Sequence, residues 1–119
     1  MHLSVVAAET PHKTAVVFGD TRISYGALDA ASRRIAVSSR QCGLSRGDVM
    51  GVMMATGPEV VAAIAAAQRS GLYCLPLAPK LTPSELQYIL KDSGAKLLVA
   101  DRGNEQKASA AAVDIPDLT

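Results

Sequence analysis

The sequence predicts an α/β fold: a mainly parallel sheet with helices on both faces, preceded by a small β-hairpin. Three observations lead to this prediction. Short apolar segments of strand length alternate with amphipathic helical segments three times along the 119 residues, a pattern typical of parallel α/β sheets. The apolar segments are nearly continuous, which suits strands covered on both faces. The interior is expected to be aliphatic, because aromatic residues make up only 3% of a chain that is 49% hydrophobic.

Turn and capping residues predict the N-terminal elements. The apolar segment 15–18 and the alternating segment 21–24 flank a turn that begins with Gly19, and this arrangement favours a hairpin. Ser24 is expected to cap the helix that follows the hairpin. Gly43 is expected to end that helix in a left-handed conformation.

The helix between Ser24 and Gly43 is predicted to be amphipathic, with its apolar face turned inward and its charged residues mostly off that face. The expected inward residues are Leu28, Ala31, Ile35 and Cys42. The charged residues expected off this face are Asp29, Arg33, Arg34 and Arg40.

The middle of the chain predicts a strand followed by a helix. Residues 49–54 form an apolar run that suits a strand covered on both faces. Thr56 and Glu59 have the spacing of a capping box. Pro58 lies in the first helical turn, where its missing N–H costs little. Gly71 is expected to close this helix.

A second strand and helix follow directly. Residues 73–77 are predicted to form the strand. Thr82, Pro83 and Glu85 make a complete helix start, with a cap, a proline at the first position and a returning carboxylate at the third. Gly94 is expected to stop the helix.

The C-terminal part predicts one more strand and one more helix. Residues 96–100 form the strand, and Asn104 is expected to cap a helix that runs to about Ala112. Residues 113–119 are expected to form a loose tail. The length allows one domain only, and we expect residues 1–119 to be a single, partial domain.

Composition excludes several classes of protein. The formal net charge is +1, with cations scattered among acids, so a nucleic-acid-binding surface is not expected. Cys42 and Cys74 show no metal-type spacing and are expected to be reduced, half-buried thiols of a cytoplasmic protein. Residues 1–4 lack the pattern of a signal peptide. The apolar window 49–68 is interrupted by a Gly-Pro-Glu turn at 57–59, so no transmembrane segment is expected.

Few polar residues are candidates for a site. The turn at Thr56 and Gly57 leads into a helix N-terminus, where anions can bind, but Glu59 would repel a phosphate there. Lys80 follows a strand and is interpreted as a solvated turn lysine. The histidines at 2 and 12 have no partner at ligand spacing. We therefore assign no catalytic, cofactor-binding or metal-ligating residue.

Six segments together resemble one known family. They lie between residues 13 and 101, and their number, order and spacing make the match specific: residues 15–20, 23–29, 43–49, 57–61, 69–77 and 81–96. In this order they resemble the N-terminal subdomain of the AMP-forming acyl-CoA synthetases, which join a carboxylic acid to AMP and then to coenzyme A. The last segment looks more like fatty-acyl and related CoA ligases than the amino-acid-activating domains of peptide synthetases.

The resemblance implies a scaffold without a reactive centre. In the family, a Ser/Thr/Gly-rich loop with a lysine grips the ATP phosphates, an acidic residue binds the ribose and a C-terminal lysine drives adenylation. None of these matches a position in this sequence, so no catalytic residue is carried over. The implied parent is an ATP-dependent fatty-acid–CoA ligase that uses ATP, Mg and CoA. The fragment alone is expected to be inactive and to bind none of these cofactors.

Partners and alternatives follow from the same interpretation. Surface that would meet the missing subdomains is expected to be apolar, so self-association and binding to the rest of the ligase are both expected. One alternative is a flavodoxin-like nucleotide-binding module that uses the Thr56–Gly57 turn. A scarcity of aromatic residues in loops to stack a flavin argues against it. Another alternative is a protein-interaction module that pairs with a full-length synthetase.

Overall fold

The computed structural model describes residues 2–112, so the predicted tail at 113–119 lies outside the described residues. The elements follow in the order α1 Leu3–Glu9, β1 Thr14–Phe18, β2 Thr21–Ser24, α2 Tyr25–Gln41, β3 Val49–Met53, α3 Pro58–Ser70, β4 Tyr73–Pro76, α4 Pro83–Ser93, β5 Leu97–Ala100, a 3₁₀ turn Arg102–Asn104, and α5 Glu105–Ala112.

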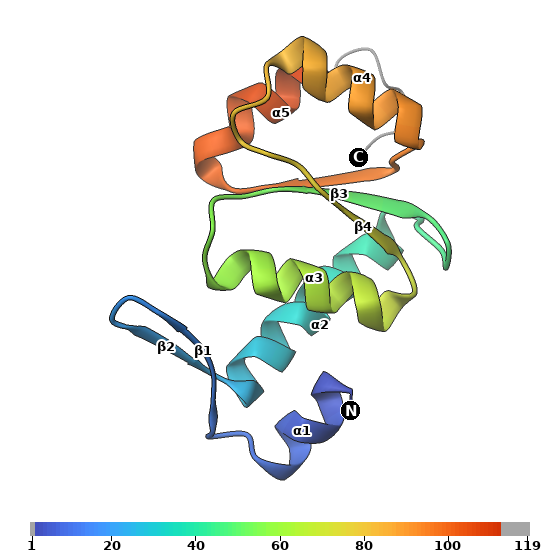
Figure 1. Ribbon diagram of the computed structural model, residues 1–119. Helices are drawn as coiled ribbons and strands as arrows, with labels where there is room; N and C mark the ends of the chain where they lie inside the picture. The colour runs from blue at the N-terminus through green and yellow to red at the C-terminus, as the bar shows by residue number, and fades with distance from the viewer. Residues whose placement is uncertain (1, 113–119) are drawn as a thin grey trace.

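Three parallel strands form the sheet, in the order β4-β3-β5. Met50 of β3 lies opposite Cys74 of β4 and Leu97 of β5. Helices α2 and α3 lie on one side of this sheet and α4 and α5 on the other, while the hairpin of β1 and β2 stands to the side of α2 as a separate antiparallel pair (Figure 1). The predicted fold class, a parallel sheet covered on both faces and preceded by a hairpin, is confirmed.

The core is divided by β3, which turns alternate side chains to the two faces. One buried cluster lies under α2 and α3, and the other lies under α4 and α5. Gly51 is part of the second face: a Cβ on this residue would lie 3.1 Å from Leu77 and 3.3 Å from Leu90 and Leu98. The α2/α3 cluster contains Leu44, Met50, Val52, Ala63, Ala67 and Leu97, and the α4/α5 cluster contains Met53, Leu77, Leu86, Leu90, Ala95 and Ala111.

Two helix starts form as predicted. Ser24 Oγ accepts from the Ala27 N–H at 3.1 Å, which begins α2. The capping box of α4 is complete: Thr82 Oγ1 accepts from the Glu85 N–H at 3.2 Å, and Glu85 Oε1 accepts from the Thr82 N–H at 3.0 Å. The hydrogen bonds to Thr82 hold the pKa of Glu85 below its usual value. Both caps depend only on residues within one helical turn, which is why the sequence predicts them.

The inward face of α2 differs from the prediction. Asp29, expected off the inward face, is 7% exposed, and Cys42, expected on that face, is exposed at the helix end. The buried residues of α2 are Leu28, Asp29, Ser32, Ala36 and Ser39. This face packs on the alanine-rich helix α3, and Asp29 is buried there because Arg69 of α3 pairs with it. A cation from another helix thus changes which side of α2 is inward.

Helix α1 was not predicted. It is only seven residues long, which is too few turns for its apolar residues to show a helical repeat in the sequence. His2 precedes it, and its Nδ1 accepts from the Ser4 N–H at 3.1 Å. His2 is therefore an exposed capping residue, in agreement with its interpretation as a surface histidine rather than a ligand. In residues 2–112, no helix is long and apolar enough to span a membrane.

Candidate functional site

The turn between β3 and α3 leads into a helix N-terminus, where a capping role was expected rather than an anion site. The predicted capping box is wrong: Gly57, not Thr56, precedes α3, and no side chain caps the helix. A Cβ built on Gly57 would lie 3.3 Å from Glu59 Oε2, so the carboxylate lies against the start of α3. The helix N-terminus thus has its own acid beside it, which disfavours a phosphate.

Asp101 connects this turn to the end of β5. Its carboxylate accepts from the Ala55 N–H at 2.9 Å and from Asn104 Nδ2 at 2.6 Å. These hydrogen bonds, the one from Ala55 first, hold the pKa of Asp101 below its usual value. Asn104, expected to cap the last helix, ends a 3₁₀ turn from Arg102 that directly precedes α5, and its side-chain amide donates to Asp101. Asp101 is therefore committed to holding two loops together.

Lys80 lies in the turn after β4 and is exposed, as predicted for a turn lysine. The adjacent carbonyl of Pro79 accepts a hydrogen bond from Lys107 Nζ of α5. The turn is thus held to α5 by Lys107, while Lys80 itself makes no contact that would place it in a site.

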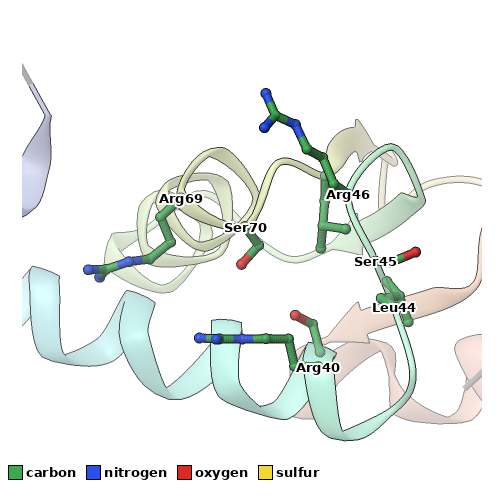
Figure 2. Close-up of a pocket in the computed structure, with 8 residues that line it drawn as sticks. Arg40, Leu44, Ser45, Arg46, Arg69 and Ser70 are labelled. Carbon is green, nitrogen blue, oxygen red and sulfur yellow. The ribbon is translucent and has the colours of Figure 1, made fainter.

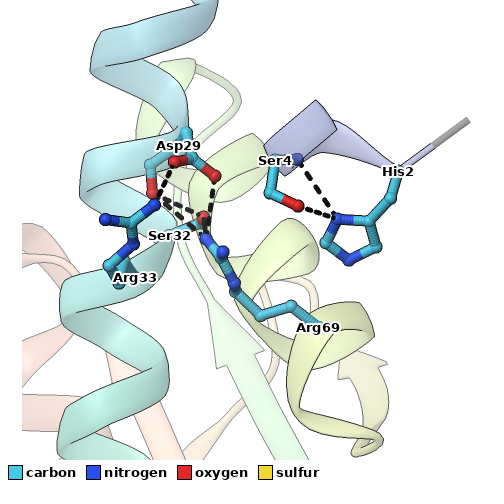
Figure 3. Close-up of polar contacts among 6 residues, drawn as sticks. All are labelled: His2, Ser4, Asp29, Ser32, Arg33 and Arg69. Carbon is cyan, nitrogen blue, oxygen red and sulfur yellow. Dashed lines mark hydrogen bonds and ion pairs between the residues drawn. The ribbon is translucent and has the colours of Figure 1, made fainter. Parts of the chain in front are cut away.

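The most connected polar group of the described residues joins α2 to α3 (Figure 3). The Asp29 carboxylate pairs with Arg33 Nη2 at 2.7 Å and with Arg69 Nη1 at 3.0 Å. Arg69 Nη1 also donates to Ser32 Oγ at 2.8 Å. The Arg33 side chain is 63% exposed, whereas those of Arg69 and Asp29 are 17% and 10% exposed. This group holds the two helices together. Because the Asp29 carboxylate is already shared by two guanidinium groups, it is not free to act as a base toward a substrate.

A hollow of 380 Å³ lies where α2 and α3 end (Figure 2). Ser70 Oγ is buried there and has no hydrogen-bond partner among the described residues. The guanidinium of Arg46 points away from both helices in Figure 2. Arg40 and Arg69 lie in the last turns of α2 and α3, where cations offset the negative helix ends. Arg69 is already engaged by Asp29 and Ser32, and Arg40 lies at a helix end that favours a cation.

The described residues contain no ready-made cluster of metal ligands. No group of three or more His, Cys, Asp or Glu side chains in residues 2–112 could hold a metal ion. The acids at 29, 85 and 101 are each engaged by protein donors. Burial raises the pKa of the Cys74 thiol, which makes it a poor nucleophile. What this arrangement does is position helices on a sheet.

Curated proteins with similar sequences include the non-canonical nonribosomal peptide synthetase cpsA of Aspergillus campestris, which is 34% identical over 101 residues, 85% of this chain and 10% of that protein. Tyrocidine synthase 3 of Brevibacillus parabrevis is 36% identical over 93 residues, which are 78% of this chain and 1% of that protein. Zwittermicin A synthase ZmaJ of Bacillus cereus is 34% identical over 93 residues, which are 78% of this chain and 18% of that protein. The expected preference for fatty-acyl ligases over peptide synthetases is therefore not confirmed.

Solved structures with the same fold include an anthranilate CoA ligase. The N-terminal domain of FACL13 from Mycobacterium tuberculosis has a TM-score of 0.85 at 24% identity, over 98% of this chain and 31% of that chain. The anthranilate CoA ligase AuaEII in complex with anthranoyl-AMP has a TM-score of 0.87 at 19% identity, over 98% of this chain and 22% of that chain.

The chain thus spans a small part of the proteins that it matches, 1% of tyrocidine synthase 3 and 18% of ZmaJ. The sequence profile of the AMP-binding enzymes matches residues 3–118, nearly the whole chain. On this match, the chain belongs to the AMP-binding enzyme family.

Proposed function

We propose that this chain is the N-terminal scaffold of an adenylate-forming ligase. One observation carries the proposal: the family match covers residues 3–118, while the most connected polar side chains described within that span are used for a helix cap and a contact between helices. The chain forms a single, partial domain that supplies sheet and helices to a site built elsewhere. The 119 residues alone are inactive.

The parent enzyme converts a carboxylate and ATP into an acyl-adenylate and pyrophosphate. Its acyl group then passes to a thiol, with release of AMP. Mg offsets the phosphate charge in such reactions. We place its ligands outside this chain, in keeping with the lack of a group of three or more candidate ligands in residues 2–112. Within this chain, the Asp29–Arg69 contact and the capped helices keep the sheet rigid beneath the site.

Two acid classes are candidates for the parent. We propose a fatty acid transferred to CoA, on the resemblance of residues 81–96 and on CoA ligases with the same fold. An amino acid activated for peptide synthesis is the second candidate, because the curated relative cpsA, at 34% identity, is a nonribosomal peptide synthetase. In either case the acid is expected to contact residues outside this chain.

The test is ATP–pyrophosphate exchange, measured with labelled pyrophosphate. The longest polypeptide that carries this chain is assayed with a panel of fatty acids and a panel of amino acids, and the 119-residue chain is assayed in parallel. Exchange by the longer polypeptide with one panel, and none by the chain alone, is expected. Exchange by the chain alone contradicts the scaffold role, and no exchange by the longer polypeptide contradicts adenylate formation. A spectral change on titration of the chain with FMN would instead support the flavodoxin-like alternative.

A further inference from the structure

The hollow where α2 and α3 end, called here the helix-end hollow, has an excess of positive charge. Three arginines lie in its wall, Arg40 of α2, Arg46 of the loop before β3 and Arg69 of α3, and no acidic side chain of the described residues lines it. Arg69 is paired with Asp29 at 3.0 Å. Each helix end carries roughly half a negative charge, so the two ends offset about one more cation and leave about one positive charge over.

Three hydrogen-bond donors of this hollow are uncommitted in the described part of the chain. The guanidinium groups of Arg40 and Arg46 make no ion pair or hydrogen bond with residues 2–112, and both residues are exposed. Ser70 Oγ is buried in the wall and has no partner there. A buried hydroxyl in this state has lost its hydrogen bonds to water and gained none in return.

The other polar groups at the hollow are already engaged. The Asp48 carboxylate, beside Ser45 of the wall, accepts from the Ser45 N–H at 2.9 Å and pairs with Lys96 Nζ at 3.3 Å. Asp48 therefore does not neutralise the two free arginines. Ser39 Oγ donates to the Ala36 carbonyl at 2.8 Å. The charge and the free donors thus come from Arg40, Arg46 and Ser70 alone.

We propose that the helix-end hollow binds a phosphate group, either as free phosphate or as the monoester of a small molecule. Arg40 and Arg46 donate charge-assisted hydrogen bonds to its oxygens, and Ser70 donates through its hydroxyl. The Arg46 guanidinium points away from both helices (Figure 2) and the Ser70 hydroxyl is buried, so both turn toward the phosphate when it binds. Neither rotation breaks a hydrogen bond, because neither group makes one with the described residues.

The shape of the site favours phosphate over a carboxylate. Its three donors come from α2, from the loop before β3 and from α3, which suits a tetrahedral anion, whereas a planar carboxylate is satisfied by one guanidinium group. The hollow measures 380 Å³, and Leu44 and Leu72 offer an apolar wall to the carbon atoms of an ester. The site goes beyond the proposed function and does not depend on it, because phosphate binding requires no adenylate formation.

The test is an NMR titration of the 119-residue chain with inorganic phosphate and with phenyl phosphate, each against sodium chloride at matched ionic strength. Arg40→Gln removes a cation from the hollow, and Arg34→Gln removes the same charge from an exposed position of α2 outside it. Ser70→Ala removes the unpartnered hydroxyl. All three keep a helix-forming residue and are expected to fold, which circular dichroism checks.

Saturable shifts of the amides of residues 44–46 and 69–72 are the expected result. Arg40→Gln and Ser70→Ala are each expected to weaken binding about tenfold, the loss of one hydrogen bond to a charged group, whereas Arg34→Gln leaves the affinity unchanged. Phosphate is also expected to raise the thermal unfolding temperature of the wild-type chain and of Arg34→Gln more than that of Arg40→Gln. Equal affinity for the two probes identifies free phosphate as sufficient, and tighter binding of phenyl phosphate identifies an ester; both results support the inference.

Three results would overturn it. One is a titration in which phosphate shifts the amides no more than sodium chloride does. Another is an equal loss of affinity in Arg34→Gln and Arg40→Gln, because the effect is then one of overall charge. The third is an affinity that neither Arg40→Gln nor Ser70→Ala changes.

Discussion

The contact between Asp29 and Arg69 gives a prediction with an internal control. Arg69→Met removes one cation from Asp29 and keeps the aliphatic stem, and Arg33→Met does the same on the other oxygen. The Asp29 and Arg69 side chains are 10% and 17% exposed, whereas Arg33 is 63% exposed. Breaking a buried pair costs about 3–5 kcal/mol, and an exposed pair four residues apart on a helix contributes about 0.3–0.5 kcal/mol.

We expect Arg69→Met to lower the free energy of unfolding by about 3 kcal/mol, the lower end of the range, because Asp29 keeps Arg33 at 2.7 Å. Arg33→Met is expected to lower it by less than about 0.5 kcal/mol. Urea unfolding followed by circular dichroism measures both, and a cycle with Asp29→Ala isolates each coupling. High salt should weaken only the exposed pair. Equal losses for the two variants would refute the reasoning that burial and separation in sequence decide the contribution.

Three further predictions concern a turn, the pH dependence and the core. Gly71→Ala is expected to lower the free energy of unfolding in urea more than Gly94→Ala does. Both glycines have φ near +70°, which costs an alanine about 1 kcal/mol, but only at Gly71 would the new Cβ meet Arg46, at 2.7 Å from its Cγ. Equal losses would contradict the contact with Arg46. Asp101→Asn is expected to reduce the loss of stability between pH 6 and pH 3. The pKa of Asp101 is lowered in the folded chain, so the stability that its carboxylate contributes is present above the unfolded pKa near ~4 and is lost as the pH falls through the folded value. A pH profile of the thermal unfolding temperature that the substitution leaves unchanged would contradict this. Leu90→Ala removes a side chain at a fully buried position and is expected to lower the free energy of unfolding, measured in urea, by about 2–5 kcal/mol. A loss below about 1 kcal/mol would mean that α4 does not pack as described.

The fold was predictable where its signals are local. Thr82 and Glu85 satisfy each other within one turn, so their spacing alone predicts the start of α4. Thr56 and Glu59 show the same spacing, but the carboxylate lies against Gly57 instead. The sequence does not distinguish these two outcomes, because both place the same acid in the first turn of the helix.

Non-local contacts account for what the sequence did not predict. The inward face of α2 depends on Arg69, which is 40 residues from Asp29 along the chain. A period of apolar residues cannot reveal a buried acid whose partner lies on another helix. The one signal of a polar inward face was that Asp29 and two serines lie on the side of α2 that also carries Leu28 and Ala36. The family was predictable from the six matched segments, whereas the acid class was not, because this chain is similar in sequence to a nonribosomal peptide synthetase and in fold to a CoA ligase.

The strand order has a consequence during synthesis on the ribosome. β3 occupies the centre of the sheet, yet its neighbour β5 follows only after α3, β4 and α4. A nascent chain therefore carries a half-paired central strand until Leu97–Ala100 has left the exit tunnel. Until that moment Leu86 and Leu90 lack part of their final packing. A translational pause before this point leaves a polypeptide that is prone to aggregation and open to chaperones and proteases.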